Sequence, residues 1–543
     1  MKLDIAPELR SQLRSRTLTA AALLTASLVT GGWLIVRGTQ DAAATPAEAE
    51  RLFDQVFAHI ERFYVDSVGR PILYRKAVEG MLYELEDPYT ALLAPDKLGK
   101  LNERTSGNYA GVGIQVDMRD GWLVVITPMP GSPAERAGIQ PGDRITEIEG
   151  RSAKGWTLEE ATKAFWGAAG TSLSMRVERP GAVAPIPYTL ARKPLHQSAV
   201  RRIAMLSNGV GYIDLKAFSD STTREMTRSI DSLEAKGMKS LVLDMRSNPG
   251  GLLDQGLSVS DLFLGAGQRI VSLRGRAPGV NRDYADSTAQ RWPGLPLIIL
   301  VDDKSASAAE IVAGALQDHD RALIVGEPTY GKGSAQTIVP LGDDGGLKIT
   351  TARWYTPAGR SISKRAVRDD SDVPASDANP QRFKTDGGRI VFGGGGISPD
   401  LVVADSALAW QVRILQTSLG RKVGLFRDAL TDYALAVKAR GEVTSPQFVV
   451  TSPMLQEVWK QLVARGVDIP RMIYDESSQL VSSLLAYDIA RFVFGPEGEF
   501  RRRAASDRVI AVALVLATGV KSDAALLDRA AATQKAQGYP GTR

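Results

Sequence analysis

The spacing of apolar residues divides the chain into a helical stretch, a long α/β stretch and a second helical stretch. Between residues 49 and 104, apolar residues recur about every four positions, as on one helix face, with Leu52, Val56, Ile60 and Tyr64. From 195 to 404, short apolar runs alternate with helical patterns, which predicts an α/β core with a mixed sheet and flanking helices. From 405 to 543 the pattern is mainly helical again, with looser order expected in the last twenty or so residues.

Residues 297–336 carry the pattern with the most chemical content. Two apolar runs of strand length, 297–301 and 322–325, flank an Ala-rich helical stretch at 306–316. Ser305 and Ser307 therefore lie where a strand leads into a helix N-terminus, and unpaired N–H groups there favour negative charge.

Ser307 has two interpretations at this position. Ser307-Ala-Ala-Glu310 fits the S-x-x-E capping box, which would make Ser307 an N-cap. A nucleophilic serine would need a base, and the chain has no cysteine and three histidines. His319 is twelve residues further along the same predicted helix, about 18 Å away, so a Ser-His-Asp triad is not expected.

Lys332 is the better candidate for the base. It follows the second strand, between Gly331 and Gly333, in a loop that can return to the start of the helix. A lysine normally titrates near 10.4, and burial lowers that pKa enough for a general base. The alternative is a solvated loop lysine. Residues 326–332 also match the first seven positions of a P-loop, but Gly333 replaces the required Ser or Thr and a strand pattern follows, which excludes a nucleotide site.

Two glycine-rich turns could present backbone N–H groups. Gly250 and Gly251 follow a predicted buried strand at 240–245, where their N–H groups can form an oxyanion hole or merely a tight turn. Residues 111–114 precede an alternating strand, where successive N–H groups can hold a peptide carboxylate or simply allow a turn.

Two segments resemble the carboxyl-terminal processing peptidases, tail-specific serine proteases with a Ser/Lys dyad: Ser-Ala-Ser-Ala-Ala-Glu-Ile at 305–311 and Gly-Glu-Pro-Thr-Tyr-Gly-Lys-Gly-Ser-Ala-Gln at 326–336. The resemblance covers roughly residues 50–404. In that family the serine precedes the lysine by twenty-five positions, which selects Ser307 over Ser305. The family more often has Ser at the position of Ala309, a departure that does not touch the dyad.

The resemblance also implies roles for other residues. Gln336 would hold Lys332, and the Ala308 N–H with that of Gly250 or Gly251 would stabilise the oxyanion. It identifies 105–181 as a PDZ domain, with strands expected at 122–126, 145–148 and 172–177, a helix at 157–166, and a carboxylate-binding loop of Gly111, Val112, Gly113 and Ile114. The predicted organisation is thus an N-terminal helical segment at 49–104, the PDZ domain, a linker at 182–194, the tail-specific protease core at 195–404 and a C-terminal helical region at 405–543.

One apolar run, residues 17–36, has the length of a membrane span. Lys2, Arg10, Arg14 and Arg16 precede it, which places 1–16 in the cytoplasm by the positive-inside tendency. Ala42-Ala43-Ala44 offers an alternative cleavage site. We therefore expect a single-pass protein of the cytoplasmic membrane, with its catalytic body on the periplasmic side.

Composition adds little. The net charge of +5 over 543 residues is mild and does not point to nucleic acid. No metal or other cofactor is implied.

We expect a serine endopeptidase acting on exported proteins with free C-terminal tails. The alternative is a catalytically silent, membrane-tethered PDZ scaffold, and a homo-oligomer is left open because the C-terminal helices can cap the core, dimerise or hold a partner.

Overall fold

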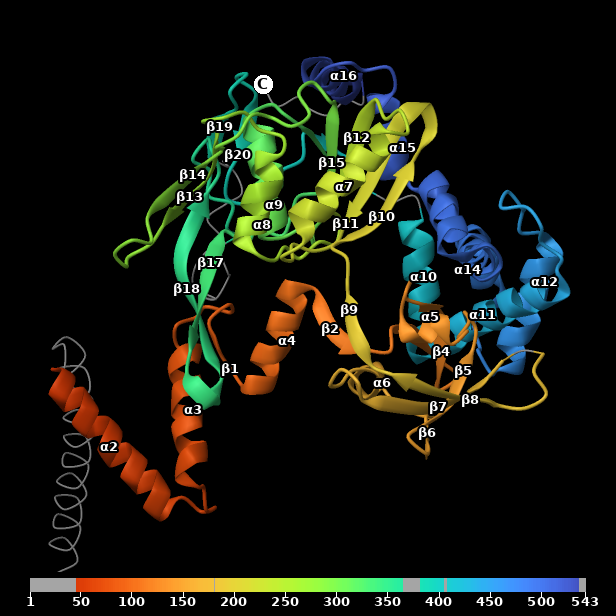
Figure 1. The fold of residues 1–543 in the computed structure, drawn as a ribbon, viewed down its shortest axis with the longest axis horizontal. Helices are drawn as coiled ribbons and strands as arrows, with labels where there is room; N and C mark the ends of the chain where they lie inside the picture. The colour runs from red at the N-terminus through yellow and green to blue at the C-terminus, as the bar shows by residue number, and fades with distance from the viewer. Residues whose placement is uncertain (1–44, 180, 365–380, 405–407, 537–543) are drawn as a thin grey trace, which may run out of the picture. The chain divides into compact units, whose positions relative to one another are not determined.

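The computed structural model describes residues 45–179, 181–364, 381–404 and 408–536 (Figure 1). The chain forms two compact units, Met1–Ala91 and Leu92–Arg543.

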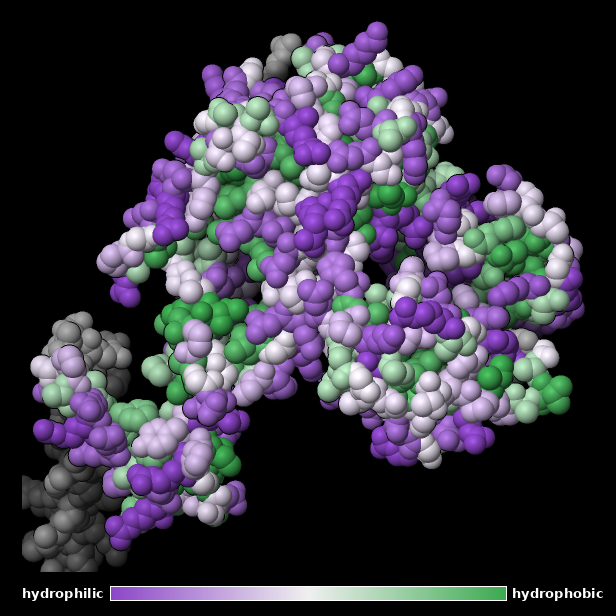
Figure 2. All heavy atoms as spheres, in the orientation of Figure 1, coloured by the Kyte–Doolittle hydropathy of each residue, from purple (hydrophilic) through white to green (hydrophobic). Residues whose placement is uncertain are grey.

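The first unit contains the two helices that the four-residue spacing predicts, α2 (Pro46–Phe63) and α3 (Arg70–Tyr83). Each begins with a proline in its first turn, where a missing N–H costs nothing. Phe57 and Leu73 are buried, and the ring of Phe57 lies 4.3 Å from that of Tyr74. Much apolar surface stays exposed on these helices, including Leu52 and Phe63; Figure 2 shows apolar side chains at the surface here.

The second unit starts within β1 (Ala91–Leu93) and continues with α4 (Pro95–Ser106). An antiparallel sheet follows in the order β3-β4-β5-β7-β8, to which β6 adds by pairing with β5. The bounds are β3 (Ile114–Arg119), β4 (Trp122–Pro128), α5 (Pro133–Arg136), β5 (Arg144–Ile148), β6 (Arg151–Ser152), α6 (Leu158–Phe165), β7 (Ser172–Glu178) and β8 (Ile186–Ala191). The strands and helix expected in this part are confirmed. Its small core includes Val112, Leu123 and Phe165.

The predicted linker at 182–194 is wrong, because most of it is strand. It contains β8 and the start of β9 (Lys193–His196), which pairs antiparallel with β2 (Asn108–Gly111). Apolar and polar residues alternate only weakly along this segment, so its sequence did not indicate a strand. A strand that pairs with a distant partner can form without a strong local pattern. The chain therefore enters and leaves the small sheet through two paired strands.

A mixed six-stranded sheet in the order β10-β11-β12-β15-β16-β21 forms the centre of the α/β part, as predicted. All neighbouring pairs are parallel except β10 with β11. The strands are β10 (Val200–Met205), β11 (Val210–Leu215), β12 (Ser240–Asp244), β15 (Leu297–Val301), β16 (Leu323–Gly326) and β21 (Leu401–Val402). Because side chains alternate along a strand, the sheet has two apolar faces that must both be covered.

Each face of this sheet packs against a different part of the chain. One face packs with α7 (Thr222–Glu234), α8 (Leu253–Asp261) and α9 (Ala308–Asp318). The other face, through residues such as Val242 and Leu300, packs with α15 (Arg508–Ala517) and α16 (Asp523–Ala536). The C-terminal helices therefore complete the core, one of the roles left open by the sequence.

Smaller elements surround the central sheet. β18 (Gly346–Tyr355) pairs with both β17 (Ser334–Pro340) and β13 (Arg269–Arg274), and β13 pairs with β14 (Arg282–Ala285). A short hairpin of β19 (Arg382–Lys384) and β20 (Ile390–Phe392) follows. Single 3-10 turns lie at Ser207–Gly209, Gly342–Asp344 and Gly420–Lys422.

The remaining C-terminal helices form a separate apolar cluster beside the small antiparallel sheet. They are α10 (Ala409–Leu419), α11 (Val423–Arg440), α12 (Ser452–Ala464), α13 (Arg471–Glu476) and α14 (Ser478–Ser506). The turn between β3 and β4 contacts α11: Arg119 Nε donates to Thr431 Oγ1 at 3.1 Å, and the Asp120 N–H donates to Asp428 Oδ2 at 2.9 Å. Polar contacts thus join the small sheet to the C-terminal helices.

The prediction of a single-pass protein of the cytoplasmic membrane is corrected. Among the described helices, none is long and apolar enough to cross a membrane. Those of eighteen residues or more, α2, α11 and α14, carry charged residues along their length. The predicted anchor at 17–36 and the segment 1–16 lie outside the described residues. The membrane location, and the periplasmic placement that depended on it, are withdrawn.

Candidate active site

The three loops singled out in the sequence follow neighbouring strands of the central sheet. The turn with Gly250 and Gly251 follows β12, Ser307 follows β15, and Lys332 follows β16. The carboxyl ends of parallel strands meet at one edge of a sheet, and such edges are where α/β folds bind ligands. The topology therefore brings all three loops to the same edge.

Ser307 has a strained backbone at the start of α9, with φ 56° and ψ −114°. A residue with a Cβ rarely adopts a positive φ, and the cost of about 1–3 kcal/mol must be met by the surrounding structure. Only half of the predicted capping box forms: the Ser307 N–H donates to Glu310 Oε2 at 2.7 Å, whereas the Ser307 hydroxyl does not cap the helix. The hydroxyl is left for other chemistry, on a strand-to-helix turn of the kind that presents nucleophilic serines.

Ser305 has a structural environment instead. Its side chain is fully buried, and its hydroxyl donates to the Met245 carbonyl oxygen at 2.8 Å. The same hydroxyl accepts from the Asp302 N–H at 2.9 Å. Ser305 thereby ties the turn after β15 to the end of β12.

Glu310, which the sequence suggested only as a capping residue, links the Ser307 turn to the Lys332 loop. Its carboxylate is completely buried, and Oε2 accepts from the N–H of Ser307 at 2.7 Å and from the N–H of Lys332 at 3.0 Å. The two backbone nitrogens are therefore at most about 5.7 Å apart, the sum of those two distances. Oε1 accepts from the Gly331 N–H at 2.7 Å and from the Thr329 hydroxyl at 2.6 Å.

Four donors explain how a carboxylate is held in the interior. Burial raises the pKa of Glu310, while hydrogen bonds from Thr329, Gly331, Lys332 and Ser307 oppose that rise. The sequence did carry a signal for this role. Glu310 is the single acidic residue in the first ten positions of an otherwise small and apolar helix, and a buried charge requires specific partners.

Gly250 lies directly against the Ser307 turn. A Cβ at Gly250 would lie 2.8 Å from the Ser307 Cβ and 2.6 Å from the Ala306 carbonyl oxygen, so the close approach requires glycine. The Gly250 N–H donates to Asn248 Oδ1 at 2.9 Å. Among the residues that the structure describes, neither the Gly251 N–H nor the Ala308 N–H donates to another protein group.

Gln336 lies near the start of β17. Its amide nitrogen donates to Ser334 Oγ at 2.9 Å and to Thr350 Oγ1 at 3.2 Å. Its role in holding Lys332 stays a prediction.

The predicted carboxylate-binding loop lies away from this edge, in the small sheet. Gly111, Val112 and Gly113 are buried and Ile114 is partly buried. The Val112 N–H donates to the Phe165 carbonyl oxygen at the end of α6, at 3.2 Å. β3, which follows the loop, is an edge strand of its sheet. Peptide binding through Val112 would have to replace the contact with Phe165.

Comparison with known proteins finds two families and several relatives. Residues 209–373 match the description Peptidase family S41, and residues 124–179 match PDZ domain. A carboxy-terminal-processing protease of Bartonella bacilliformis is 37% identical over 336 residues, covering 61% of this chain and 76% of the relative. The carboxy-terminal processing protease CtpA of Bacillus subtilis is 32% identical over 351 residues, covering 65% of this chain and 74% of the relative. Among solved structures, the photosystem II D1 C-terminal processing protease aligns at 30% identity with a TM-score of 0.37, covering 66% of this chain and 87% of that one.

Proposed function

The chain belongs to peptidase family S41 and is a serine-type, carboxy-terminal-processing protease with a PDZ domain; from this premise we propose that Ser307 and Lys332 are its catalytic dyad and that the PDZ domain binds substrate tails. The observation that carries the dyad is the shared acceptor. Because Glu310 Oε2 accepts from both backbone N–H groups, the serine and the lysine are held on one buried anchor. The strained backbone and uncapped hydroxyl of Ser307 support the same assignment.

In the proposed reaction, the neutral amine of Lys332 takes the proton from the Ser307 hydroxyl as its oxygen attacks the peptide carbonyl carbon. The carbonyl oxygen becomes an oxyanion that accepts hydrogen bonds from the N–H groups of Ala308 and Gly251. We favour Gly251 over Gly250 because the Gly250 N–H is already bound to Asn248.

Collapse of the intermediate breaks the C–N bond, and the leaving amine takes the proton from Lys332. Water then attacks the Ser307 ester, with Lys332 again accepting a proton, and the returning proton frees the Ser307 hydroxyl. Gln336 would restrain Lys332 through both steps.

The proposed tail site uses the loop of Gly111, Val112, Gly113 and Ile114 with the free edge of β3. An extended peptide can add to an edge strand while its carboxylate meets the N–H groups of the loop. The substrates are then proteins with free C-terminal tails. That these substrates are exported proteins depended on the membrane anchor, and it is not proposed.

A homo-oligomer also stays a prediction. Its support is the exposed apolar surface of α2, where Leu52 and Phe63 are more than half exposed. Sedimentation of the full chain at several concentrations measures this directly: a single monomeric species throughout would contradict it.

Tail recognition is tested with one protein substrate prepared with a free or an amidated C-terminus. Amidation removes the negative charge, and charge-assisted hydrogen bonds contribute about 1.5–3 kcal/mol, so affinity should fall about 10- to 100-fold. Equal cleavage of both forms by the full chain would overturn tail recognition. Deleting residues 108–196, from β2 to β9, removes the whole small sheet between Gly107 and Gln197, which are hydrogen-bonded to each other. This deletion separates two roles: loss of a domain that only tethers substrate would raise KM alone, whereas loss of one that gates the dyad would change kcat.

A further inference from the structure

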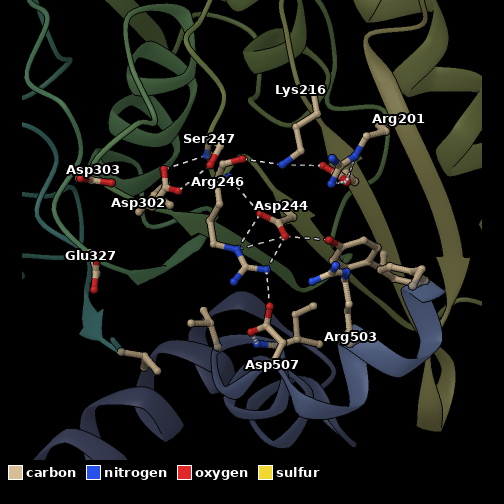
Figure 3. Close-up of a pocket in the computed structure, with 18 residues that line it drawn as sticks. Arg201, Lys216, Asp244, Arg246, Ser247, Asp302, Asp303, Glu327, Arg503 and Asp507 are labelled. Atoms are coloured by element: carbon tan, nitrogen blue, oxygen red, sulfur yellow. Dashed lines mark hydrogen bonds and ion pairs between the residues drawn. The ribbon is translucent and has the colours of Figure 1, made fainter. Parts of the chain in front are cut away.

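The C-terminal helices reach the loop that carries Gly250 and Gly251. α14 ends at Ser506, α15 begins at Arg508, and Asp507 between them faces the carboxyl end of β12. Figure 3 shows the side chains there, in a cavity of about 450 Å³ where Arg246 lies between Asp244 and Asp507. Arg246 is four residues before Gly250.

Arg246 is bound by carboxylates from two separate parts of the chain. Its guanidinium Nη2 lies 2.7 Å from Asp244 Oδ2 and 2.9 Å from Asp507 Oδ2, and its side chain is 19% exposed. Burial alone would lower the pKa of Arg246, whereas the hydrogen bonds and charges of Asp244 and Asp507 raise it above its ordinary value. A charge this far from water depends on such partners.

The residues after Arg246 are anchored within the protease core. The Arg246 carbonyl oxygen accepts from Lys216 Nζ at 2.6 Å. The Ser247 N–H donates to Asp302 Oδ1 at 2.8 Å, and the Asn248 side chain donates to the Leu215 carbonyl oxygen at 2.8 Å. Of these anchors, the guanidinium of Arg246 is the one bound from the C-terminal region.

We propose that Asp507 is a positioning residue for the oxyanion hole, acting through Arg246 to fix the turn that presents the Gly251 N–H. The inference rests on the proposed function of that turn. It assigns the C-terminal region a part in catalysis in addition to covering the sheet. If an oxyanion donor is displaced by a fraction of an ångström, it stabilises the transition state less, while binding of the substrate in its ground state is preserved.

Asp507 also caps α15, and the test must separate the two roles. Its Oδ1 accepts from the Ile510 N–H at 3.0 Å. Asparagine caps a helix about as well as aspartate, so Asp507→Asn keeps the cap and removes the charge that faces Arg246.

Asp523 provides a matched control in the same region. It is the first residue of α16, and its Oδ1 lies 3.1 Å from Nη1 of Arg321, a buried arginine bound to Phe263, Trp292 and Leu295 carbonyl oxygens. Asp523→Asn therefore removes an equivalent ion pair that has no connection with the oxyanion turn.

The experiment measures kcat, KM and the affinity of a peptide aldehyde, whose adduct with Ser307 carries the oxyanion, for each purified full-length variant. Asp507→Asn should lower kcat about 5- to 10-fold and reduce the affinity for the peptide aldehyde by a similar factor, with KM unchanged. Asp507→Glu, which restores the charge, should recover most of the loss, and Asp523→Asn should keep wild-type kcat.

An unchanged kcat in Asp507→Asn, or equal losses in Asp507→Asn and Asp523→Asn, would overturn the inference. If Asp507→Asn does not fold, Asp507→Ser, a neutral residue that also caps, is judged by the same criteria. Ser307→Ala in the same assay keeps the two proposals distinguishable: activity in that variant would remove the dyad, whereas an inactive Ser307→Ala with a fully active Asp507→Asn removes only the role of Asp507.

Discussion

The backbone N–H groups of Ser307 and Lys332 donate to the same oxygen atom, Oε2 of Glu310, at 2.7 and 3.0 Å. The two residues are twenty-five positions apart, and β16 runs between them. A single buried carboxylate therefore sets the distance between the proposed nucleophile and the proposed base. We therefore expect Glu310 to be as necessary to the proposed site as the dyad itself.

Replacing Glu310 with glutamine should impair both folding and activity. A carboxamide has one acceptor oxygen, so two of the four donors lose their partner, at about 1–3 kcal/mol each. Thermal unfolding and cleavage rate measure the two effects. Glu160→Gln is the control: Glu160 accepts from the Thr157 N–H in an exposed capping box, so this substitution should change stability little and activity not at all. A fully active Glu310→Gln would show that the anchor is dispensable.

Lys332→Arg should abolish cleavage while the fold is retained, because an arginine stays protonated and accepts no proton near neutral pH. Wild-type activity should also fall as the pH is lowered, since a protonated lysine is not a base. Lys364→Arg is the matched control: Lys364 lies beside the same loop, where its amine donates to the Thr329 carbonyl oxygen at 3.0 Å. Lys332 has no part in the reaction if the Arg variant cleaves at the wild-type rate.

Gly250→Ala should displace the Ser307 turn. The new Cβ would lie 2.6 to 2.8 Å from Ala306, Ser307 and Ala308 atoms, and a misplacement of about 1 Å costs about 100-fold in rate. Gly267→Ala separates this clash from backbone strain, because Gly267 has nearly the same φ, 88° against 87°, and open space around it. Equal activity of the two variants would contradict the close approach.

Asp428, on α11, should make stability depend on pH. Burial, with the neighbouring Asp120 carboxyl, raises the pKa of Asp428 to about 6. The folded chain therefore holds this proton more tightly than the unfolded chain, whose aspartates titrate near 3.9. The stability that Asp428 contributes to the folded state is therefore fully present below about pH 4 and is lost as the pH rises through 6.

Asp428→Asn copies the protonated side chain. At pH 7.5 the variant should therefore be more stable than the wild type, by about 1 kcal/mol after solvent screening, and should unfold at a higher temperature. The gain should vanish near pH 4. A variant that is less stable than the wild type at pH 7.5 would show that the ion pair with Arg119 outweighs the cost of burial.

The elements and the three loops of the site follow from local signals. A few neighbouring residues are enough to predict the strand before Ser305, the Ala-rich helix and the glycine-flanked loop of Lys332. The sheet then brings these elements together. The central sheet and the PDZ strands were predictable for the same reason.

The parts that were missed depend on partners far along the chain. Three of the four donors to Glu310 come from residues 329–332, and Arg246 meets Asp507 across 261 positions. No local sequence pattern indicates either contact. β9 begins in the stretch expected to be a linker, because pairing with the distant β2 outweighed its weak alternation of apolar and polar residues. That α15 and α16 cover one face of the central sheet likewise needed the structure.

The most direct test of the account compares Ser307→Ala with Ser305→Ala in the cleavage of an unfolded protein such as casein. Ser307→Ala should lose at least about a thousandfold in rate and keep the wild-type unfolding temperature, because only the proposed nucleophile is removed. Ser305→Ala should keep cleaving but lose about 1–3 kcal/mol of stability, because the Asp302 N–H loses its acceptor and the Met245 carbonyl oxygen keeps only the Asn248 N–H. An inactive Ser305→Ala beside an active Ser307→Ala would contradict the assignment of the nucleophile, and the dyad with it.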